Sequence, residues 1–452
     1  NFYIIDFGSE SLRVLKNSPL VGDVIYPDEV DKVKNLYKMI RDEIENRKKL
    51  FSEYNGDYLS YCKNSGKTVP NIIVVINNYE AYAEFFGDSF EDTLTGLTRD
   101  GSKYGIFFVL AVVTPNGVRF KLKQNFNLNY VLQQNNDDDY STILGNIRRK
   151  YPAKLFGRGI IKIDTFYEFQ TAQIAEKDKV QDTIKNISNL LKKKYSDRAP
   201  SVPILPEIVD YNAIKDEYGK SIDPIVGISK NELTVERYNL LRSTINIVSS
   251  TDDSLLERFI KPFTSQIVGL NQYKVVIIDT SDVFKENEYL EYAQIFDKDY
   301  NKVIEILYKD IDNMYSIYKE NNYDKSVIKT DKHILCIIVG IDKLMTRLNS
   351  ENQKTLGKLF TLSNEMESIN FVVVDTIDKI KKLEYESWFK DASDTDNGIW
   401  LGNGIGDQFT LKVNAKATEL RQSVEDEYCY IIRKGKLTLV KYVEKFNLKL
   451  DK

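Results

Sequence analysis

Histidine and cysteine are scarce in this sequence, and their scarcity excludes several kinds of site. The 452 residues include one histidine, His333, and three cysteines, Cys62, Cys336 and Cys429. A Ser-His-Asp triad, a Cys-His dyad or a histidine-rich zinc site would depend on His333 alone, and that residue opens an apolar stretch typical of a buried strand. The cysteines are too few and too scattered for a disulfide scaffold or a Cys-x-x-Cys metal site, which favours a reducing compartment.

Long apolar runs and a charge surplus are also missing. The run Ile106–Val113 covers less than half of the roughly 20 residues that a membrane-spanning helix needs, and no signal-peptide pattern opens the chain. Basic and acidic residues nearly balance, 63 against 67, whereas a nonspecific nucleic-acid binder usually has a basic surplus. We therefore expect a soluble globular piece that binds no nucleic acid.

Apolar strands and amphipathic helices follow one another in the order typical of an α/β fold. A long helix is predicted from its N-cap Asp28 to Phe51. Because residues 2–6 already form a complete apolar strand ending in an acid, we expect the chain to begin inside a domain. Continuous apolar strands, as in parallel sheets covered on both faces, are predicted at residues 2–6, 72–76, 106–113 and, more weakly, 129–133.

The same succession returns later in the chain at a nearly constant offset of about 263 to 273 residues, which predicts two copies of one α/β unit. The copy has its own amphipathic helix, with Val303, Leu307 and Ile311 on one face. The paired strand segments are 2–6 with 275–279, 72–76 with 337–342, 108–111 with 371–374, and 159–161 with 430–432.

Three of the ten prolines, Pro200, Pro203 and Pro206, crowd into a short segment after a lysine-rich helix that ends near Tyr195. Such a segment is typical of a stiff linker. We predict a first domain over residues 1–198, a linker over 199–210 and a second domain over 211–452.

A working phosphate loop needs the pattern G-x-x-x-x-G-K-[ST] between a strand and a helix, because glycines let backbone N–H groups wrap the phosphates while the lysine and hydroxyl hold phosphate and magnesium. Ser65-Gly66-Lys67-Thr68 lacks the first glycine and precedes a strand, and Gly219-Lys220-Ser221 runs into Asp223-Pro224. Gly402–Gly406 has the wrong spacing for a dinucleotide loop and is predicted to be a turn before a strand at 409–413.

In the second copy the position of the loop falls between a strand at 244–248 and a helix at 254–266. If Ser254 stands for the magnesium-binding hydroxyl, Asp253 replaces the lysine and Asp252 a glycine, so attraction for a triphosphate becomes repulsion. A plain capped helix start is the alternative interpretation. The residues of this degenerate nucleotide site are Ser249, Ser250, Thr251, Asp252, Asp253, Ser254 and, on the second strand, Asp342.

Hydrolysis further requires an Asp for magnesium and a neighbouring Glu at the end of the second strand. The first copy has Asn77-Asn78 there, and the second copy has Asp342-Lys343. The offset places the phosphate loop of the first copy before residue 1. We therefore predict no catalytic residue and no metal ligand in this chain.

In these segments the chain resembles the FtsK/SpoIIIE-type ATPases, and within them the EssC (YukB-like) coupling ATPases of the Gram-positive type VII secretion system. The resemblance covers essentially the whole chain. Ser102 departs from it, because it stands where active members carry the arginine of a Gly-Arg pair. The segments that carry the resemblance are 2–8, 43–51, 69–80, 97–106, 156–159 and 399–405.

The resemblance implies two tandem RecA-like P-loop-NTPase-type domains, with mainly parallel sheets flanked by helices, at the cytosolic end of a protein anchored in the membrane by segments outside this chain. It implies ATP and magnesium as cofactors of the family, although we expect this chain to bind neither tightly. It implies a homo-hexamer, other secretion-system components and small helical secreted substrates of the WXG100 type as partners, at the cytoplasmic face of the cell membrane.

The damaged positions in both copies suggest that this chain recruits substrates and regulates a motor located elsewhere in the same polypeptide. Two alternatives remain open. The first domain could be an active ATPase that uses an upstream phosphate loop, or the chain could belong to a DNA translocase of the FtsK type.

Overall fold

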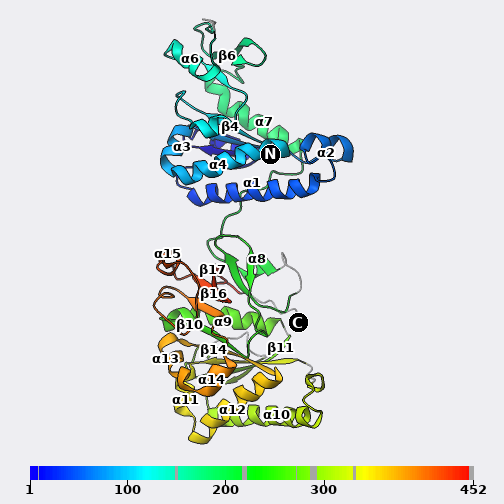
Figure 1. Cartoon of the computed structure of the whole chain (residues 1–452), viewed down its shortest axis with the longest axis vertical. Coiled ribbons are helices and arrows are strands. Elements are labelled where there is room, and N and C mark those ends of the chain that lie inside the picture. The colour runs from blue at the N-terminus through cyan, green and yellow to red at the C-terminus, as the bar shows by residue number, and fades with distance from the viewer. Residues whose placement is uncertain are drawn as a thin grey trace. The chain divides into compact units, whose positions relative to one another are not determined.

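The computed structural model describes residues 1–8, 10–147, 151–215, 221–270, 272–285, 293–328 and 332–446 (Figure 1). The chain divides into two compact units, Asn1–Ile204 and Leu205–Lys452. The junction between them lies among the prolines of segment 199–210. The decoy Gly219-Lys220 lies outside the described residues.

Unit 1 is built around a sheet of four parallel strands in the order β2-β1-β3-β4. Alternate residues of these strands, such as Tyr3, Ile5 and Val74, pack against α1, α3 and α4 in one core. The strands are β1 (Phe2–Asp6), β2 (Val21–Ile25), β3 (Ile72–Asn77) and β4 (Ile106–Ala111), and the helices are η1 (Ser11–Asn17), α1 (Val30–Phe51), α2 (Tyr58–Ser65), α3 (Tyr79–Phe86), α4 (Asp88–Gly101), η2 (Ser102–Tyr104) and α5 (Phe120–Lys123).

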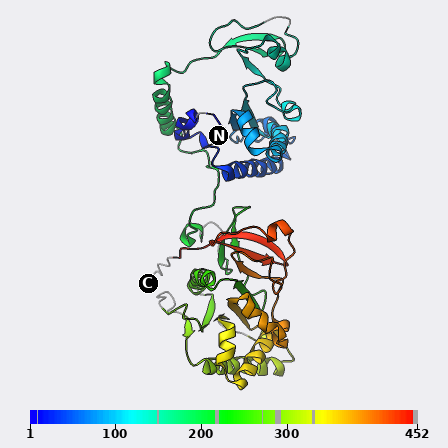
Figure 2. The same ribbon diagram turned by 90° about the vertical axis from the view of Figure 1, so that its left-hand side faces the viewer.

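Unit 1 also contains a small antiparallel sheet, β5-β6-β7, set apart from the main sheet of that unit (Figure 2). The predicted strand at 129–133 belongs to this small sheet, so its assignment to a parallel sheet was wrong. The elements are β5 (Tyr130–Leu132), α6 (Asp137–Leu144), β6 (Arg158–Lys162), β7 (Phe166–Gln170), η3 (Lys177–Lys179) and α7 (Val180–Lys194).

Unit 2 contains one sheet of ten strands in the order β12-β11-β13-β14-β10-β15-β16-β17-β8-β9. The pairings are parallel from β12 to β15 and antiparallel from β15 to β9. The strands are β8 (Ile225–Ser229), β9 (Val235–Arg237), β10 (Ile245–Ser250), β11 (Tyr273–Asp279), β12 (Gln294–Phe296), β13 (His333–Val339), β14 (Ile369–Thr376), β15 (Gly398–Leu401), β16 (Tyr428–Arg433) and β17 (Lys436–Tyr442).

Helices cover both faces of this sheet, as the α/β prediction requires (Figure 1). Leu256, Phe259 and Ile260 of α9 pack on one face, and α10 with α12 packs on the other. The helices are α8 (Tyr211–Ile214), α9 (Asp253–Gly269), α10 (Tyr300–Glu320), η6 (Lys325–Val327), α11 (Ile341–Arg347), α12 (Ser350–Met366), α13 (Ile377–Lys381), η7 (Lys382–Tyr385), α14 (Ser387–Ala392) and α15 (Ala417–Leu420).

The repeat predicted from the sequence is visible in the strand order, because β2-β1-β3-β4 of unit 1 matches β12-β11-β13-β14 of unit 2. The helix predicted from Asp28 begins at Val30 with Glu29 as its N-cap residue, and its expected apolar face is buried. Two predictions failed. Segment 159–161 lies in the small sheet whereas 430–432 lies in the main one, and no strand forms at 409–413.

Candidate functional site

The segment predicted as a degenerate phosphate loop lies at the carboxyl end of β10, where that strand leads into α9. The strand extends two residues further than predicted, to Ser250, and α9 begins at Asp253. Only Thr251 and Asp252 therefore separate strand and helix. A phosphate cradle needs a longer loop, because several successive backbone N–H groups must turn toward the anion.

The side chains of Ser249, Ser250 and Asp252 in and beside this short connection are hydrogen-bonded within the protein. The buried Ser249 and Ser250 hydroxyls donate to the carbonyl oxygens of Asp375, at 2.8 Å, and Leu401, at 2.9 Å. Asp252 caps α9 by accepting a hydrogen bond of 2.8 Å from the Ser254 N–H, and this bond lowers the pKa of the Asp252 carboxyl. The capped helix start, the alternative left open by the sequence, is the arrangement found.

Asp253, predicted to take the place of the phosphate-loop lysine, is paired with a lysine from another helix. Lys379 Nζ in α13 lies 3.0 Å from Asp253 Oδ1 and 3.0 Å from Asp375 Oδ1. Burial by itself lowers the pKa of Lys379, but its hydrogen bonds to Asp375 and Asp253 outweigh burial and the pKa is raised. An ammonium group therefore sits at this edge of the sheet, and the protein's own carboxylates hold it.

Asp342 joins the same network, although it does not lie at the end of a strand. The strand β13 ends at Val339, and Asp342 is the second residue of α11. Its backbone N–H donates to Asp375 Oδ2 at 3.2 Å, and its carboxylate pairs with Lys382 Nζ at 2.9 Å. The sequence thus placed Asp342 at the correct edge of the sheet but in the wrong element.

The pairing of Asn77-Asn78 with Asp342-Lys343 was consequently wrong by three residues. Asn78 and Gly340 both have positive φ angles, 58° and 79°, and each precedes the helix that follows its strand. Asn77-Asn78 at the end of β3 therefore corresponds to Val339-Gly340 at the end of β13. Both lack the two carboxylates that hydrolysis requires.

In unit 1 the acid at the end of the first strand is a structural group. Asp6 is fully buried and accepts hydrogen bonds from the Gly8 N–H at 3.0 Å, the Leu12 N–H at 3.4 Å and Asn77 Nδ2 at 2.8 Å. In unit 2 the buried Asp279 similarly accepts from two backbone N–H groups of the turn that follows it. In both units the strand-plus-acid pattern therefore coincides with a turn whose N–H groups the acid accepts from.

Sequence reasoning missed three residues of the network, namely Asp375, Lys379 and Lys382. A signal was present, because Asp375 and Lys379 are four residues apart at the end of an apolar strand. That strand, β14, pairs directly with β10 in the parallel sheet, so its carboxyl end lies beside the site. The sequence pattern alone does not show that Asp375 and Lys379 lie beside the site, because that depends on the strand order.

The remaining candidate groups lie away from this edge. His333 opens β13 at the opposite, amino end of the strand and lies with Nε2 2.5 Å from Asn370 Oδ1. Ser65 ends α2, and the segment after it leads into a strand. Within the described ranges, no group of three or more potential protein ligands could hold a metal ion. In the same ranges, no helix is long and apolar enough to span a bilayer.

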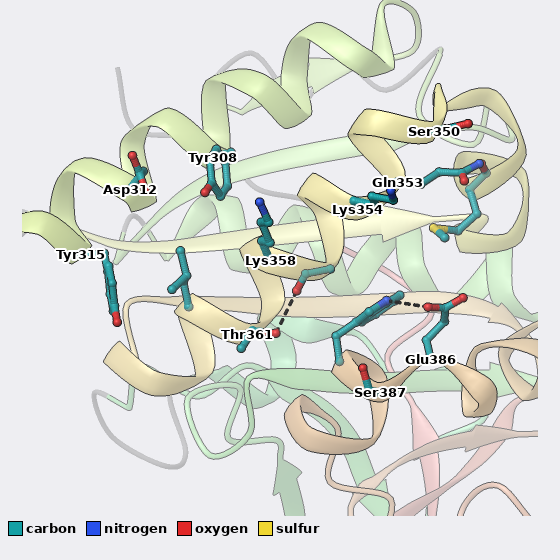
Figure 3. A pocket seen from close by; sticks show the side chains of 14 residues that line it. Tyr308, Asp312, Tyr315, Ser350, Gln353, Lys354, Lys358, Thr361, Glu386 and Ser387 are labelled. Carbon is teal, nitrogen blue, oxygen red and sulfur yellow. Dashed lines mark hydrogen bonds between the residues drawn. The ribbon is translucent and has the colours of Figure 1, made fainter.

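A groove of about 670 Å³ opens in unit 2 between α10, α12 and the start of α14 (Figure 3). Its floor is the Trp388 indole, stacked on Phe360 at 4.8 Å. A Cβ atom at Gly357 would lie 2.7 Å from that ring, so only glycine lets α12 approach it. The groove is lined by Tyr308, Asp312, Tyr315, Met345, Ser350, Gln353, Lys354, Gly357, Lys358, Thr361, Leu362, Glu386, Ser387 and Trp388.

Known proteins resemble the chain along nearly its whole length, although no family profile matches it. The type VII secretion system protein EssC of Staphylococcus aureus (strain MRSA252) is 24% identical over 447 residues, which are 95% of this chain and 29% of that protein. The ESX secretion system protein EccC of Geobacillus thermodenitrificans is 27% identical over 225 residues, 48% of this chain and 15% of that protein. The chain thus spans less than a third of these relatives.

Solved structures show the same fold. EssC (ATPases 2 and 3) from Geobacillus thermodenitrificans superposes with a TM-score of 0.81 at 18% identity, over 99% of this chain and 85% of that one. Thermomonospora curvata EccC (ATPases 2 and 3), in complex with a signal sequence peptide, superposes with a TM-score of 0.57 at 16% identity, over 99% and 82%. The predicted pair of tandem ATPase-type α/β domains is confirmed. The chain is thus similar to the EssC and EccC proteins of type VII secretion systems, and its fold is that of their ATPases 2 and 3.

Proposed function

We propose that this chain recruits secreted substrates and regulates the motor of a type VII secretion ATPase, and that its second unit does not hydrolyse ATP. The observation that carries the proposal is the Asp253–Lys379–Asp375 network at the phosphate-loop position. A triphosphate placed there would meet the exposed Asp253 carboxylate, and the nearest ammonium already has two carboxylate partners. The two-residue connection before α9 offers too few free N–H groups to offset that repulsion.

The groove between α10 and α12 supplies a place for the substrate. The Thermomonospora curvata relative is solved with a signal sequence peptide, and we propose that a signal segment of a small helical, WXG100-type protein binds in this groove. Two tyrosines two turns apart on α10, Tyr308 and Tyr315, face α12 across it (Figure 3). Aromatic walls with a few polar groups suit a helical segment that carries an apolar stripe.

Tryptophan fluorescence tests this binding directly. The sequence has two tryptophans, Trp388 in the groove and Trp400 in the core of the same unit. Titration with a synthetic signal-segment peptide should change the emission, and the change should vanish in Trp388→Phe. Tyr315→Ala should weaken binding by about 1–2 kcal/mol, as expected for an aromatic anchor, whereas Tyr323→Ala, outside the groove, should not. Equal binding by Tyr315→Ala and the parent chain would overturn the proposed location.

For unit 1 we propose that the chain holds the later part of an ATPase module whose phosphate loop lies upstream of residue 1. In unit 2 the strand β10 pairs with β14, and α9 covers the adjacent sheet face. In unit 1 the strand that corresponds to β14 is β4, and it is the last strand of its sheet. Its residues Phe107 and Val109 are 43 and 49% exposed. A further strand and helix would cover these side chains, since exposed apolar sheet faces are unusual in a complete domain.

Two alternatives make different predictions. If unit 1 were an active ATPase that used an upstream loop, a longer protein would hydrolyse ATP, and activity would fall when unit 1 alone was altered. If the protein were an FtsK-type DNA translocase, it would bind duplex DNA with a steep dependence on salt. A flat gel-shift titration at low salt would exclude the translocase. The formal net charge of −4 favours that result.

We further propose that the full protein assembles from several copies, as a homo-hexamer, with this part at the cytoplasmic face of the cell membrane. Other secretion-system components would then contact the ring. Titration calorimetry with magnesium and ATP is the matching test of the cofactors, and we expect no tight binding to this chain.

A further inference from the structure

One end of the groove in unit 2 is built by two segments that are far apart in the sequence. The helix α11 contributes Met345. The segment that follows η7 contributes Glu386, Ser387 and Trp388 (Figure 3). The shape of the groove at this end therefore depends on how these two segments are held against each other.

An ion pair links the two segments. Lys382, the first residue of η7, places Nζ 3.0 Å from Asp342 Oδ1 and 2.9 Å from Asp342 Oδ2, and the two residues are 40 positions apart in the sequence. Asp342 is held in turn, because its backbone N–H donates to the buried Asp375 carboxylate at 3.2 Å. The pair precedes Met345 by one turn on α11 and precedes Glu386 by one turn on the other segment. It therefore lies beside the groove in both segments.

The floor of the groove leaves little room for displacement of the second segment. Trp388 stacks on Phe360 with the ring centroids 4.8 Å apart and an angle of 9° between the ring planes. The close approach at Gly357, where a Cβ atom would lie 2.7 Å from the indole, shows that α12 and the ring are already in contact. Contacts packed this closely are lost on small shifts, because dispersion attraction falls steeply with distance. A displacement of η7 therefore changes the shape of the groove.

The hydrophobic core does not hold the groove-lining part of this segment directly. Leu383 and Phe389 are buried in the core on either side of it. Between these two residues the chain runs along the surface, and Tyr385 is 89% exposed. Glu386 and Ser387 are exposed as well. The start of η7, where Lys382 pairs with Asp342, is thus the point from which this surface stretch is positioned.

We propose that Asp342 and Lys382 are positioning residues of the ligand groove. Their ion pair holds the start of η7 against α11 and thereby fixes where Glu386, Ser387 and Trp388 stand. The inference rests on the proposed function, which assigns the groove as the binding site for a signal segment. It also gives the Asp342 carboxylate a role that requires no nucleotide.

Charge reversal tests the role of the pair in ligand binding. Lys382→Glu replaces attraction to Asp342 by repulsion, and Lys381→Glu, at the exposed preceding position, makes the same change in net charge and is the matched control. In titrations with a synthetic signal-segment peptide of a WXG100-type protein, the dissociation constant should rise roughly fivefold in Lys382→Glu and less than about twofold in the control. The charge swap Asp342→Lys with Lys382→Glu should recover most of the affinity. Because the Lys382 side chain is 63% exposed, the difference between Lys382→Glu and the parent chain should shrink at about 0.5 M salt.

Acrylamide quenching of tryptophan fluorescence tests the shape of the groove without any peptide. Trp400 is fully buried and Trp388 is only partly buried, so quenching reports mainly on the groove floor. The quenching constant should rise in Lys382→Glu, stay at the parent value in Lys381→Glu and return toward it in the charge swap. Urea midpoints of all variants, measured alongside, show that each one is folded under the conditions of the titration.

The two readouts separate the positioning role from the proposed function. If the parent chain binds the peptide and Lys382→Glu equals Lys381→Glu in both affinity and quenching, the positioning role is overturned and the binding site stands. If the charge swap recovers neither property, the loss does not come from the ion pair, and the role is again contradicted. If the parent chain does not bind the peptide, the proposed binding site falls. Quenching then decides alone, and equal quenching constants for Lys382→Glu and Lys381→Glu would overturn the positioning role as well.

Discussion

Replacing Lys379 with methionine should destabilise unit 2 far more than replacing its partner Asp253. Methionine keeps most of the volume of the side chain and removes the ammonium group. The two ion pairs are equal in length, 3.0 Å each, but differ in burial. The Asp253 side chain is 74% exposed and that of Asp375 is 2% exposed. Loss of the lysine therefore leaves one carboxylate in water and the other without its cation in the protein interior.

The magnitude follows from that asymmetry. Breaking a buried pair by removing one partner costs about 3–5 kcal/mol, while an exposed pair contributes about 0–1 kcal/mol. Asp375 keeps hydrogen bonds from the Thr376 and Asp342 N–H groups, at 2.9 and 3.2 Å, which reduces the cost. We expect Lys379→Met to lose about 2–4 kcal/mol and Asp253→Asn less than about 1 kcal/mol.

Urea unfolding followed by tryptophan fluorescence measures this loss in the right unit, because both tryptophans lie in unit 2. With a slope of about 3 kcal/mol per molar urea, the Lys379→Met midpoint should fall by about 1 M. The double variant Lys379→Met with Asp375→Asn should recover most of the loss, since neither charge then remains buried.

The reasoning would be refuted if Lys379→Met were as stable as Asp253→Asn. It would also be refuted if the double variant were no more stable than Lys379→Met, since the cost would then not come from an unpaired carboxylate.

Three further predictions concern local structure. Gly340→Ala combines a φ of 79° with a Cβ atom that would clash with the Thr280 hydroxyl. Urea unfolding followed by tryptophan fluorescence should therefore show a loss of about 2 kcal/mol or more. Gly96→Ala, in an open helical position of unit 1, should leave this transition of unit 2 unchanged. Arg47→Ala removes a buried guanidinium that donates to two backbone carbonyls at 2.8 Å and to a glutamate at 2.6 Å. Hydrogen exchange of α1 should report a loss of about 3–5 kcal/mol in the free energy of opening. The exposed Arg41→Ala should lose less than about 0.5 kcal/mol. Asp252→Ala removes the cap of α9, and because the pKa of Asp252 is lowered in the fold, the stability difference from the parent chain should be present near neutral pH and vanish as the pH falls below about 4.

Strand positions were predictable from the sequence because buried parallel strands are continuous apolar runs. Residues 2–6, 72–76 and the segment around 371–374 all lie in strands of the main sheets. The short strand β2 was missed, since Val21-Gly22-Asp23-Val24-Ile25 carries a glycine and an acid that interrupt the apolar signal. Asp23 sits in that strand paired with Lys16 and Lys32, contacts that no local pattern shows.

The position of the candidate site could be predicted from the sequence, but its ion pairs could not. Topology puts Ser249–Ser254 and Asp342 at one edge of the sheet, and both segments are found there. Their pairing with Lys379 and Lys382 joins segments 40 or more residues apart in sequence, and such pairs depend on strand order. The shift between Asp342 and the true strand end arose because Gly340 and Ile341 continue the apolar run after β13 has ended.

The central claim is that in unit 2 the carboxylates of Asp253 and Asp375 pair with the lysine that a nucleotide phosphate would otherwise meet. Titration calorimetry of the chain with ATP and excess magnesium tests it most directly. We predict no saturable heat and no release of phosphate over hours. Saturable, magnesium-dependent binding that is lost on substituting residues 251–254 would contradict the account.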